Sequence, residues 1–389
     1  MRRMWRDVPA LQGALTGLTV SAAEASAPHR RATIHPLRVS AVERLTDDAI
    51  AIEFAVPSEL TEEYRFTHGQ HVSLRSLDAG DDVRRSYSIC SSPGSGRLRV
   101  AVKRLSGGVF SAYAHDHLQV GDTVEVVTPI GRFTTELDSA NAKSYAMIAA
   151  GSGITPILSI LTTILEVEPR SSATLIYGNR TVRDIMFLEE LEDLKNVYAE
   201  RFAMYHVLSR EEQDVALFHG RIDREHLEHF LDQLVRPEDV DEWFLCGPRQ
   251  MIDTARGLLI ERGTDAAHVH SELFHADDAP RRVEAREASA SSPASDGTSE
   301  VTIVLDGRRS TFQLARDGER VLDAALSVRS DAPYACKGGV CGTCRARLIS
   351  GSVEMEQCFA LEQREIDAGF VLACQSHPTS STVVLDFDQ

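Results

Sequence analysis

The sequence has 389 residues, 43% of them hydrophobic, and a net charge of −17 at neutral pH. This length predicts two to three domains, and the lack of any apolar run of about eighteen residues excludes a transmembrane helix. An acidic chain without a basic patch repels nucleic acid, so we expect neither a nucleic-acid nor a membrane partner. The seven cysteines form no disulfide framework, which is typical of the reducing cytoplasm.

Residues 1–30 carry no clear element. Three arginines precede a short apolar stretch, which only weakly imitates a signal peptide because Asp7 and Pro9 interrupt it. We therefore predict a disordered extension here and a cytoplasmic location for the protein.

Residues 31–139 show short alternating apolar runs separated by turn residues. This pattern predicts strands of an antiparallel β-barrel. The clearest runs cover residues 50–54, 71–75, 98–103 and 123–127.

Two motifs in this barrel suggest an anion ligand. In the first motif, the guanidinium of Arg85 suits a phosphate. The ring of Tyr87 could stack on a flat ring, and a neighbouring serine hydroxyl could donate a hydrogen bond to a ring nitrogen. The second is a glycine-rich turn before a helix predicted over residues 111–118, which would present backbone N–H groups to an anion. Together they predict a dinucleotide flavin, although Arg and Tyr on a strand are usually ordinary surface and core residues. The motifs are Arg85-Ser86-Tyr87-Ser88 and Gly107-Gly108-Val109-Phe110-Ser111.

Residues 140–275 alternate between strand and helix patterns. This order predicts a doubly wound α/β domain with a parallel sheet. Strands are expected over residues 145–150, 173–177, 202–208 and 242–246, and helices over 156–167, 185–195, 224–235 and 250–262.

Several candidate ligand residues follow the strands of this sheet. Ligands of open α/β sheets bind at the carboxyl ends of the strands. Arg180 and Arg210 there could pair with a 2′-phosphate and favour NADPH, although a single arginine is usually only solvated. We expect Thr155 to be a helix N-cap and Pro156 the first helical residue. The other candidates at these strand ends are Gly151, Gly153, Asn179, Ser209, Cys246, Gly247 and Pro248.

Residues 276–300 lack periodicity and are typical of a flexible linker. Beyond it, residues 301–389 predict a further domain, with strands over 301–305, 310–314 and 382–387 and a helix over 321–326. Its cysteines have the C-x4-C-x2-C spacing of a plant-type [2Fe–2S] cluster, whereas zinc sites usually show two C-x2-C pairs. The cysteines are Cys336, Cys341 and Cys344, with Cys358 and Cys374 following.

The motifs together resemble a known superfamily. Arg85–Ser88, Gly151–Pro156 and Cys246–Pro248 are similar to the flavin and nucleotide motifs of ferredoxin–NADP⁺ reductases. Residues 301–389 look like a plant-type ferredoxin of β-grasp fold, so the order is that of oxygenase reductases. Longer segments, including residues 84–90, 185–195 and 335–341, resemble the family of phenylacetyl-CoA epoxidase reductase subunits.

The resemblance implies roles for individual residues. Arg85 would hold the FAD pyrophosphate with Gly108–Ser111, Tyr87 would pack on the flavin ring and Ser88 would approach its N5. Thr155 and Cys246 would flank the nicotinamide, and Glu272 and Phe274 would lie near the flavin. Ser88, Cys246 and Glu272 would be the catalytic residues. The resembling pattern also selects Cys374, rather than Cys358, as the fourth cluster ligand.

The function implied is that of an NADPH-dependent oxygenase reductase. Electrons would pass through FAD and a [2Fe–2S] cluster to a di-iron oxygenase component, that of a phenylacetyl-CoA epoxidase. The alternatives are the reductase of a steroid or Rieske-type oxygenase and, outside the enzymes, a redox sensor.

Overall fold

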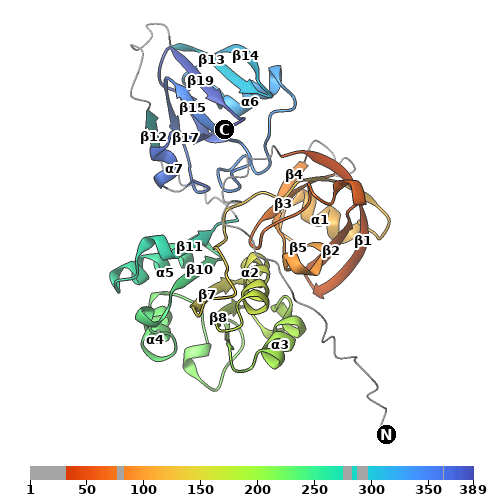
Figure 1. The fold of residues 1–389 in the computed structure, drawn as a ribbon, viewed down its shortest axis with the longest axis vertical. Helices are drawn as coiled ribbons and strands as arrows, with labels where there is room; N and C mark the ends of the chain where they lie inside the picture. The colour runs from red at the N-terminus through yellow and green to blue at the C-terminus, as the bar shows by residue number, and fades with distance from the viewer. Residues whose placement is uncertain (1–31, 77–82, 275–282, 287–296, 362) are drawn as a thin grey trace. The chain divides into compact units, whose positions relative to one another are not determined.

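The computed structural model of the chain describes residues 32–76, 83–274, 283–286, 297–361 and 363–389 (Figure 1). The extension predicted over residues 1–30 lies outside these ranges. Backbone contacts join residues 32–389 into one unit, which contains four β-sheets. Within the described ranges, no helix has both the length and the apolar character needed to cross a membrane.

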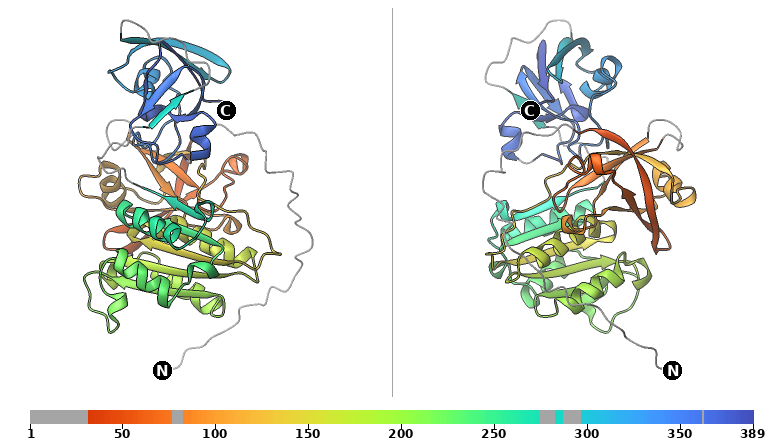
Figure 2. Two further views of the ribbon diagram at one scale, coloured as in Figure 1. Left: turned by 90° about the vertical axis from the view of Figure 1, so that its left-hand side faces the viewer. Right: turned by 45° about the vertical axis from the view of Figure 1, so that its right-hand side comes forward.

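The first sheet is antiparallel, as the alternating sequence predicts. Its six strands lie in the order β4-β3-β6-β1-β2-β5, and an isolated bridge between Ile89 and Val100 brings its two edges together. The long strand β1 is the dark red band in Figures 1 and 2. The elements are β1 (Ile34–Thr46), β2 (Ala49–Ala55), β3 (His71–Ser76), β4 (Val83–Ser88), β5 (Leu98–Lys103), α1 (Val109–Asp116) and β6 (Thr123–Val127).

Alternating side chains fill the core of this sheet. Leu37 and Val39 of β1 point inward while their neighbours are exposed, as the two-residue period of a strand requires. Helix α1 adds Phe110 to the same core. It begins at Val109, two residues before the predicted start, because Gly108 already serves as its N-cap.

The second sheet is parallel, with the order β11-β10-β7-β8-β9. Helices α2 and α3 pack on one face and α4 and α5 on the other, as Figure 1 shows. The strand order reverses between β7 and β10, which is where ligands of such sheets bind. The elements are β7 (Ser144–Ala150), α2 (Ile154–Val167), β8 (Ser172–Asn179), α3 (Leu188–Val197), β9 (Phe202–Leu208), α4 (Arg224–Gln233), β10 (Glu242–Cys246), α5 (Arg249–Glu261) and β11 (Val269–Glu272).

The start of α2 differs from the prediction. A short 3₁₀ turn over Gly151–Gly153 leads directly into the helix, whose N-cap is Gly153. Thr155 is therefore the second helical residue rather than the N-cap, and Pro156 is the third. A proline there still lies in the first turn, where its missing N–H costs no intrahelical hydrogen bond.

Helix α3 also begins later than predicted, at Leu188. Thr181 and Asp184 form a capping box around a separate 3₁₀ turn, and Phe187 then takes a left-handed conformation with φ of 60°. The strand β11, which carries Glu272, was not expected from the sequence.

The C-terminal region has a mixed five-stranded sheet in the order β14-β13-β19-β15-β17. A smaller antiparallel sheet of this region has the order β12-β16-β18. Strand β12 falls inside the predicted linker and pairs antiparallel with β16, so the linker prediction is wrong at residues 283–286. The elements are β12 (Val283–Arg286), β13 (Thr298–Leu305), β14 (Arg308–Ala315), α6 (Val321–Val328), β15 (Arg345–Ser350), β16 (Ser352–Met355), α7 (Gln363–Asp367), β17 (Phe370–Leu372), β18 (Ser376–Pro378) and β19 (Thr382–Asp386).

Candidate functional site

The residues predicted to bind flavin lie on β4 and at the start of α1. The Tyr87 ring is 5.5 Å from the Phe110 ring, which brings the two motifs together. Arg85 is exposed, and its guanidinium donates to the carbonyl of Arg84 at 2.7 Å. Its remaining N–H groups are thus accessible to an anion on this strand. Ser86 pairs through its hydroxyl with Ser73 of β3 at 3.1 Å.

The glycine turn before α1 borders a cavity of about 480 Å³. Gly107 has φ of +74°, a conformation that other residues rarely adopt. Ser111 accepts a hydrogen bond from the Leu105 N–H and donates one to the Gly108 carbonyl, both at 3.1 Å. Its hydroxyl therefore holds the turn in shape. The cavity is lined by Asp48, Arg104, Leu105, Ser106, Gly107, Gly108, Val109 and Ala112.

Two glycine turns meet at the carboxyl ends of β7 and β10. A Cβ on Gly153 would lie 2.2 Å from the Cys246 carbonyl oxygen, so only glycine permits this approach. Gly247 is less confined, since its Cβ would lie 2.7 Å from the end of the flexible Met251 side chain. Pro248 follows as the N-cap of α5. The Thr155 hydroxyl donates to the Ser152 carbonyl at 3.0 Å and is 2% exposed.

The two arginines predicted to bind a 2′-phosphate are backbone neighbours, because the Arg210 N–H donates to the Arg180 carbonyl at 2.8 Å. Their side chains differ. Arg180 donates to Asp48 at 3.1 Å and lies 3.7 Å from Asp184, whereas the Arg210 side chain is exposed and forms no ion pair with a described residue. Arg210 is thus the more accessible cation.

Asn179 and Ser209 lie beside these arginines at the strand ends. Both polar atoms of the buried Asn179 amide lack a hydrogen-bond partner among the described residues. The Ser209 hydroxyl donates to the Asn179 carbonyl at 3.3 Å. Unsatisfied buried amides are rare in folded proteins, so the Asn179 amide is a candidate contact for a bound nucleotide.

The three predicted catalytic residues come from three strands and meet at one place. The Ser88 hydroxyl donates to the Glu272 carboxylate at 3.0 Å. Glu272 of β11 pairs in register with Cys246 of β10. Burial raises the Glu272 pKa to about 8, with the Ser88 hydrogen bond acting against the rise. Burial also raises the pKa of the Cys246 thiol, with the Glu272 charge adding to the effect. Phe274, just beyond, packs against the adjacent apolar core.

One residue at this site was given no role from the sequence. His71 of β3 lies in register with Ser88 of β4, and its Nδ1 is 3.9 Å from the Glu272 carboxylate. Burial lowers the His71 pKa to about 4, while the Cys341 backbone opposes the shift. Its Nε2 makes no hydrogen bond with a described residue. The sequence marked His71 as the first residue of the strand predicted over residues 71–75.

The cluster cysteines are arranged as two pairs. Cys336 interacts with Cys341, and Cys344 interacts with Cys374. The interaction with Cys341, together with backbone N–H groups, lowers the Cys336 pKa. Cys358 is half-buried and packs at the edge of the core of this domain.

The loop around these cysteines fits a [2Fe–2S] cluster. The Gly338 N–H lies 3.3 Å from the Cys336 sulfur, and the Thr343 hydroxyl 3.1 Å from the Cys341 sulfur. Such contacts are one means of tuning a cluster. Within the described ranges no three ligand side chains converge on a single metal ion, and a two-iron cluster needs only two thiolates on each iron.

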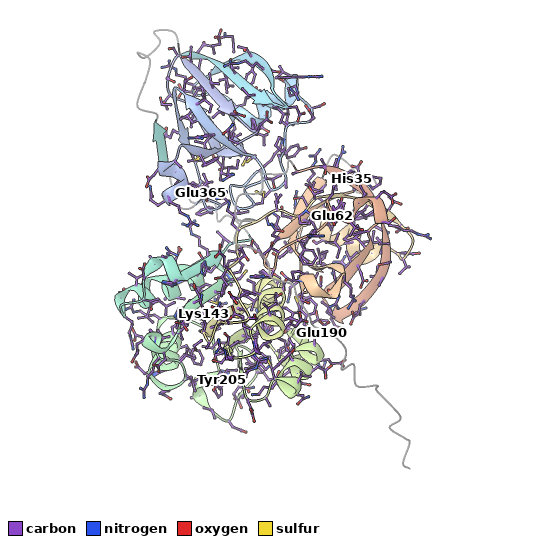
Figure 3. The ribbon with its side chains drawn as sticks, viewed as in Figure 1. His35, Glu62, Lys143, Glu190, Tyr205 and Glu365 are labelled. Atoms are coloured by element: carbon purple, nitrogen blue, oxygen red, sulfur yellow. The ribbon has the colours of Figure 1, made fainter. Side chains whose placement is uncertain are left out.

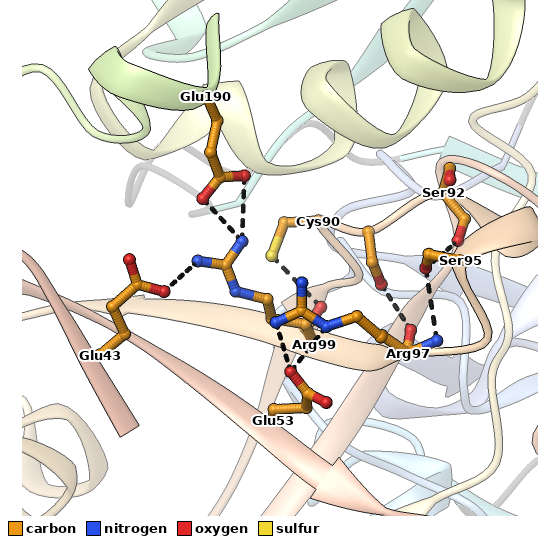
Figure 4. Close-up of polar contacts among 9 residues, drawn as sticks. Glu43, Glu53, Cys90, Ser92, Ser95, Arg97, Arg99 and Glu190 are labelled. Carbon is orange, nitrogen blue, oxygen red and sulfur yellow. Dashed lines mark hydrogen bonds and ion pairs between the residues drawn. The ribbon is translucent and has the colours of Figure 1, made fainter. Parts of the chain in front are cut away.

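A buried arginine links the first two sheets. Arg99 of β5 donates to Glu43 of β1 at 2.6 Å and to Glu190 of α3 at 2.8 Å, as Figure 4 shows. The Cys90 thiol donates to the Arg99 carbonyl at 3.3 Å. Apolar residues continue the link, because Phe133 packs edge-on against Phe244 of β10 at 5.5 Å.

Three family models match successive parts of the chain. Residues 36–135 match the oxidoreductase FAD-binding domain and residues 147–257 the oxidoreductase NAD-binding domain. Residues 303–379 match the 2Fe-2S iron-sulfur cluster binding domain. These matches confirm the predicted types of cofactor, which are FAD, a [2Fe–2S] cluster and a nicotinamide nucleotide.

Several curated proteins are similar over most of their length. The chain is 44% identical to one of the subunits of the 1,2-phenylacetyl-CoA epoxidase of Escherichia coli (strain K12), covering 92% of this chain and 98% of that protein. It is 34% identical to the ferredoxin reductase component of 3-ketosteroid-9-alpha-monooxygenase from Rhodococcus rhodochrous, covering 90% and 96%. It is 30% identical to the glycine betaine monooxygenase reductase subunit of Chromohalobacter salexigens, covering 82% and 87%.

Solved structures share the fold. Phthalate dioxygenase reductase matches with a TM-score of 0.54 at 22% identity, covering 91% of this chain and 98% of that one. An intact type IV self-sufficient cytochrome P450 monooxygenase matches with a TM-score of 0.63 at 23% identity, covering 90% and 41%. The chain belongs to the family of NAD(P)H-dependent flavin iron–sulfur oxidoreductases that serve as reductase components of oxygenases.

Proposed function

We propose that this chain is the reductase subunit of a phenylacetyl-CoA epoxidase. The observation that carries the proposal is the 44% identity to the Escherichia coli protein over nearly the whole of both chains. The steroid-monooxygenase reductase reaches 34% over a similar span. The acceptor would be the di-iron oxygenase component, and the substrate would bind there rather than on this chain.

When bound, the cofactors would supply the redox chemistry: FAD would accept a hydride from NADPH, and the cluster would pass on single electrons. The chain binds and orients these groups. Arg85 and the Gly107–Ser111 turn would hold the FAD pyrophosphate, and Tyr87 would cover the flavin ring. Cys336, Cys341, Cys344 and Cys374 would ligate the cluster.

Ser88, Cys246 and Glu272 would form the place where the flavin and nicotinamide rings meet. Their support is geometric, since the Ser88–Glu272 hydrogen bond is 3.0 Å and Cys246 adjoins Glu272 in the sheet. Cys246 is fully buried, so its side chain would help to keep water out of the nicotinamide site. These residues would therefore position the ring and exclude solvent.

The coenzyme would be NADPH, with Arg210 as the main contact for the 2′-phosphate. Arg180 supports the same site but already faces two carboxylates, Asp48 and Asp184. The location would be cytoplasmic, since no disulfide joins any of the seven cysteines and the cluster thiolates need a reducing environment.

Reconstitution tests the partner. Purified holoprotein is mixed with the oxygenase components of Escherichia coli phenylacetyl-CoA epoxidase, and NADPH oxidation is followed with and without phenylacetyl-CoA. We expect oxidation that depends on substrate and forms epoxide. If 3-ketosteroid-9-alpha-monooxygenase supports coupled turnover and the epoxidase does not, the steroid-type partner replaces this proposal.

A further inference from the structure

Glu365 is a buried carboxylate that receives arginines from two regions. It lies on α7 and is 5% exposed (Figure 3). Arg345 of β15, in the same domain, donates to its Oε1 at 2.9 Å. Arg132, which follows β6 of the flavin domain, contacts the same oxygen. Burial of an unpaired carboxylate costs free energy. Arg345 and Arg132 therefore both help to stabilise the buried Glu365.

Two further contacts join the iron–sulfur domain to the other regions, and each of them also uses an arginine. The Arg249 guanidinium of α5 lies 4.6 Å from the centre of the Phe359 ring. The Arg84 guanidinium of β4 lies 4.2 Å from the centre of the Tyr334 ring. In all three contacts the reductase regions contribute an arginine and the iron–sulfur domain contributes its acceptor. Such contacts with aromatic rings favour one placement of the two surfaces over others.

Arg132 is coupled through the backbone to the flavin site. Ile130, two residues earlier, exchanges both backbone hydrogen bonds with His71, at 2.8 and 2.9 Å. The His71 Nδ1 in turn lies 3.9 Å from the Glu272 carboxylate, and the backbone of the cluster ligand Cys341 is near enough to raise the His71 pKa against the effect of burial. The two backbone hydrogen bonds therefore anchor the segment that carries Arg132 to the strand that carries His71.

We propose that Arg132 and Glu365 are positioning residues that dock the iron–sulfur domain, so that Cys341 is held beside His71 for electron transfer from the flavin. Arg345 orients the Glu365 carboxylate from its own domain. Misplacement of reacting groups by about 1 Å can cost about a hundredfold in rate, and transfer between redox centres also falls steeply with distance. The proposal rests on the relay from flavin to cluster and not on the identity of the oxygenase.

The test uses Arg132→Gln in the holoprotein. This variant removes the Arg132–Glu365 contact between the domains but leaves Glu365 paired with Arg345, so the iron–sulfur domain keeps its own ion pair. Anaerobic stopped-flow mixing with NADPH follows flavin bleaching and then cluster bleaching. We expect the flavin step to stay within about twofold and the cluster step to slow by about tenfold.

Arg97→Gln is the matched control. Arg97 is also a half-exposed arginine of the flavin domain, but its carboxylate partner Glu53 lies in the same domain. Equal cluster-bleaching rates in the two variants would overturn the proposal. Failure of NADPH to bleach the wild-type flavin would instead refute the relay itself.

A second measurement does not depend on turnover. Small-angle scattering of the oxidised Arg132→Gln and Glu365→Gln proteins should give a larger radius of gyration than the Arg97→Gln protein. The electron paramagnetic resonance spectrum of the dithionite-reduced cluster should stay unchanged, which separates displacement of the domain from damage to the cluster. If both the radius of gyration and the rate of cluster bleaching stay unchanged, Arg132 and Glu365 have no docking role.

Discussion

The chain contains two boundaries between its regions, and they are built differently. Between the flavin and nucleotide regions, a single apolar cluster runs across and includes Cys90 and Phe133 on one side and Ile157 on the other. The buried Arg99 reinforces this boundary. The core of the iron–sulfur domain, by contrast, contains only residues from 301 to 385 among those described.

The difference matches what each boundary must do. Hydride transfer needs two rings held in contact and shielded from water, which a shared apolar core provides. The iron–sulfur domain instead has to pass electrons to a second protein, and polar contacts are weaker and are screened by salt.

The largest effect is expected for Cys341→Ser, which disables one region and leaves the other intact. We expect loss of the cluster absorbance and of cytochrome c reduction, because one thiolate ligand is missing. NADPH-dependent reduction of an artificial two-electron acceptor should survive. Absorption spectra and both assays on the purified variant measure this.

Cys358→Ser is the control for that substitution, and it should keep the cluster spectrum. Loss of both activities in folded Cys341→Ser protein would show that the regions are not separable in this way.

The next largest effect is expected for Arg99→Met, which weakens the boundary between the flavin and nucleotide regions. Removing the guanidinium leaves Glu43 and Glu190 without their cation, and we expect the free energy of unfolding to fall by about 2–3 kcal/mol. Since both glutamates keep some solvent contact, the loss should be less than for a fully buried pair. Urea unfolding followed by fluorescence measures it. Arg97→Met should cost less than about 1 kcal/mol; equal losses would place Arg99 among ordinary surface ion pairs.

A smaller effect separates the two arginines at the nucleotide site. Arg210→Ala should lower the ratio of kcat/KM for NADPH to that for NADH by about tenfold, or about 1.4 kcal/mol. Arg180→Ala should lower it less, because Arg180 is engaged by Asp48 across the first boundary. Steady-state kinetics with both coenzymes provide the values. The reverse ranking would make Arg180 the phosphate ligand and Arg210 a solvated side chain.

The smallest effect is expected for Glu168, which is hydrogen-bonded to the segment that connects the first two sheets. Its carboxylate accepts hydrogen bonds from the Asp138 N–H, the Asn141 amide, the Tyr145 hydroxyl and the Ser171 hydroxyl. Burial opposes its ionisation, but these hydrogen bonds together hold its pKa below the ordinary value. Because glutamine keeps part of this hydrogen bonding, Glu168→Gln should lower the free energy of unfolding by about 1 kcal/mol at neutral pH.

The pH dependence of that cost follows from the lowered pKa. A carboxylate with a depressed native pKa stabilises the fold fully above its unfolded pKa, about 4.3, and loses this as the pH falls through the native value. The difference in the free energy of unfolding between wild type and Glu168→Gln should therefore become smaller at acid pH, and urea titrations at several pH values would measure it. A difference that does not change with pH would mean that the charge of Glu168 does not contribute.

Sequence reasoning succeeded where a pattern is local. Period-two runs and strand–helix alternation predicted the first two sheets, and β9 (Phe202–Leu208) and β10 (Glu242–Cys246) have the predicted bounds. The cysteine spacing predicted the cluster domain, which the family model confirms. These features depend on neighbouring residues, so one sequence contains them.

What sequence reasoning missed depends on pairing across long separations. Ser88 and Glu272 are 184 positions apart, and only the resemblance placed them together. Arg132 and Glu365 are 233 positions apart, and no motif marks either residue. Strand β12 was missed because it is stabilised by pairing with β16 rather than by its own pattern. The N-cap of α2 was wrong because the glycine turn already has helical geometry.

The pairing of β12 with β16 changes how far the iron–sulfur domain can travel. Because Val283 is already part of its small sheet, only residues 275–282 connect that sheet to Phe274. A fully extended chain of this length spans roughly 30 Å. The domain is thus kept at a high effective concentration next to the flavin, whatever the strength of the arginine contacts.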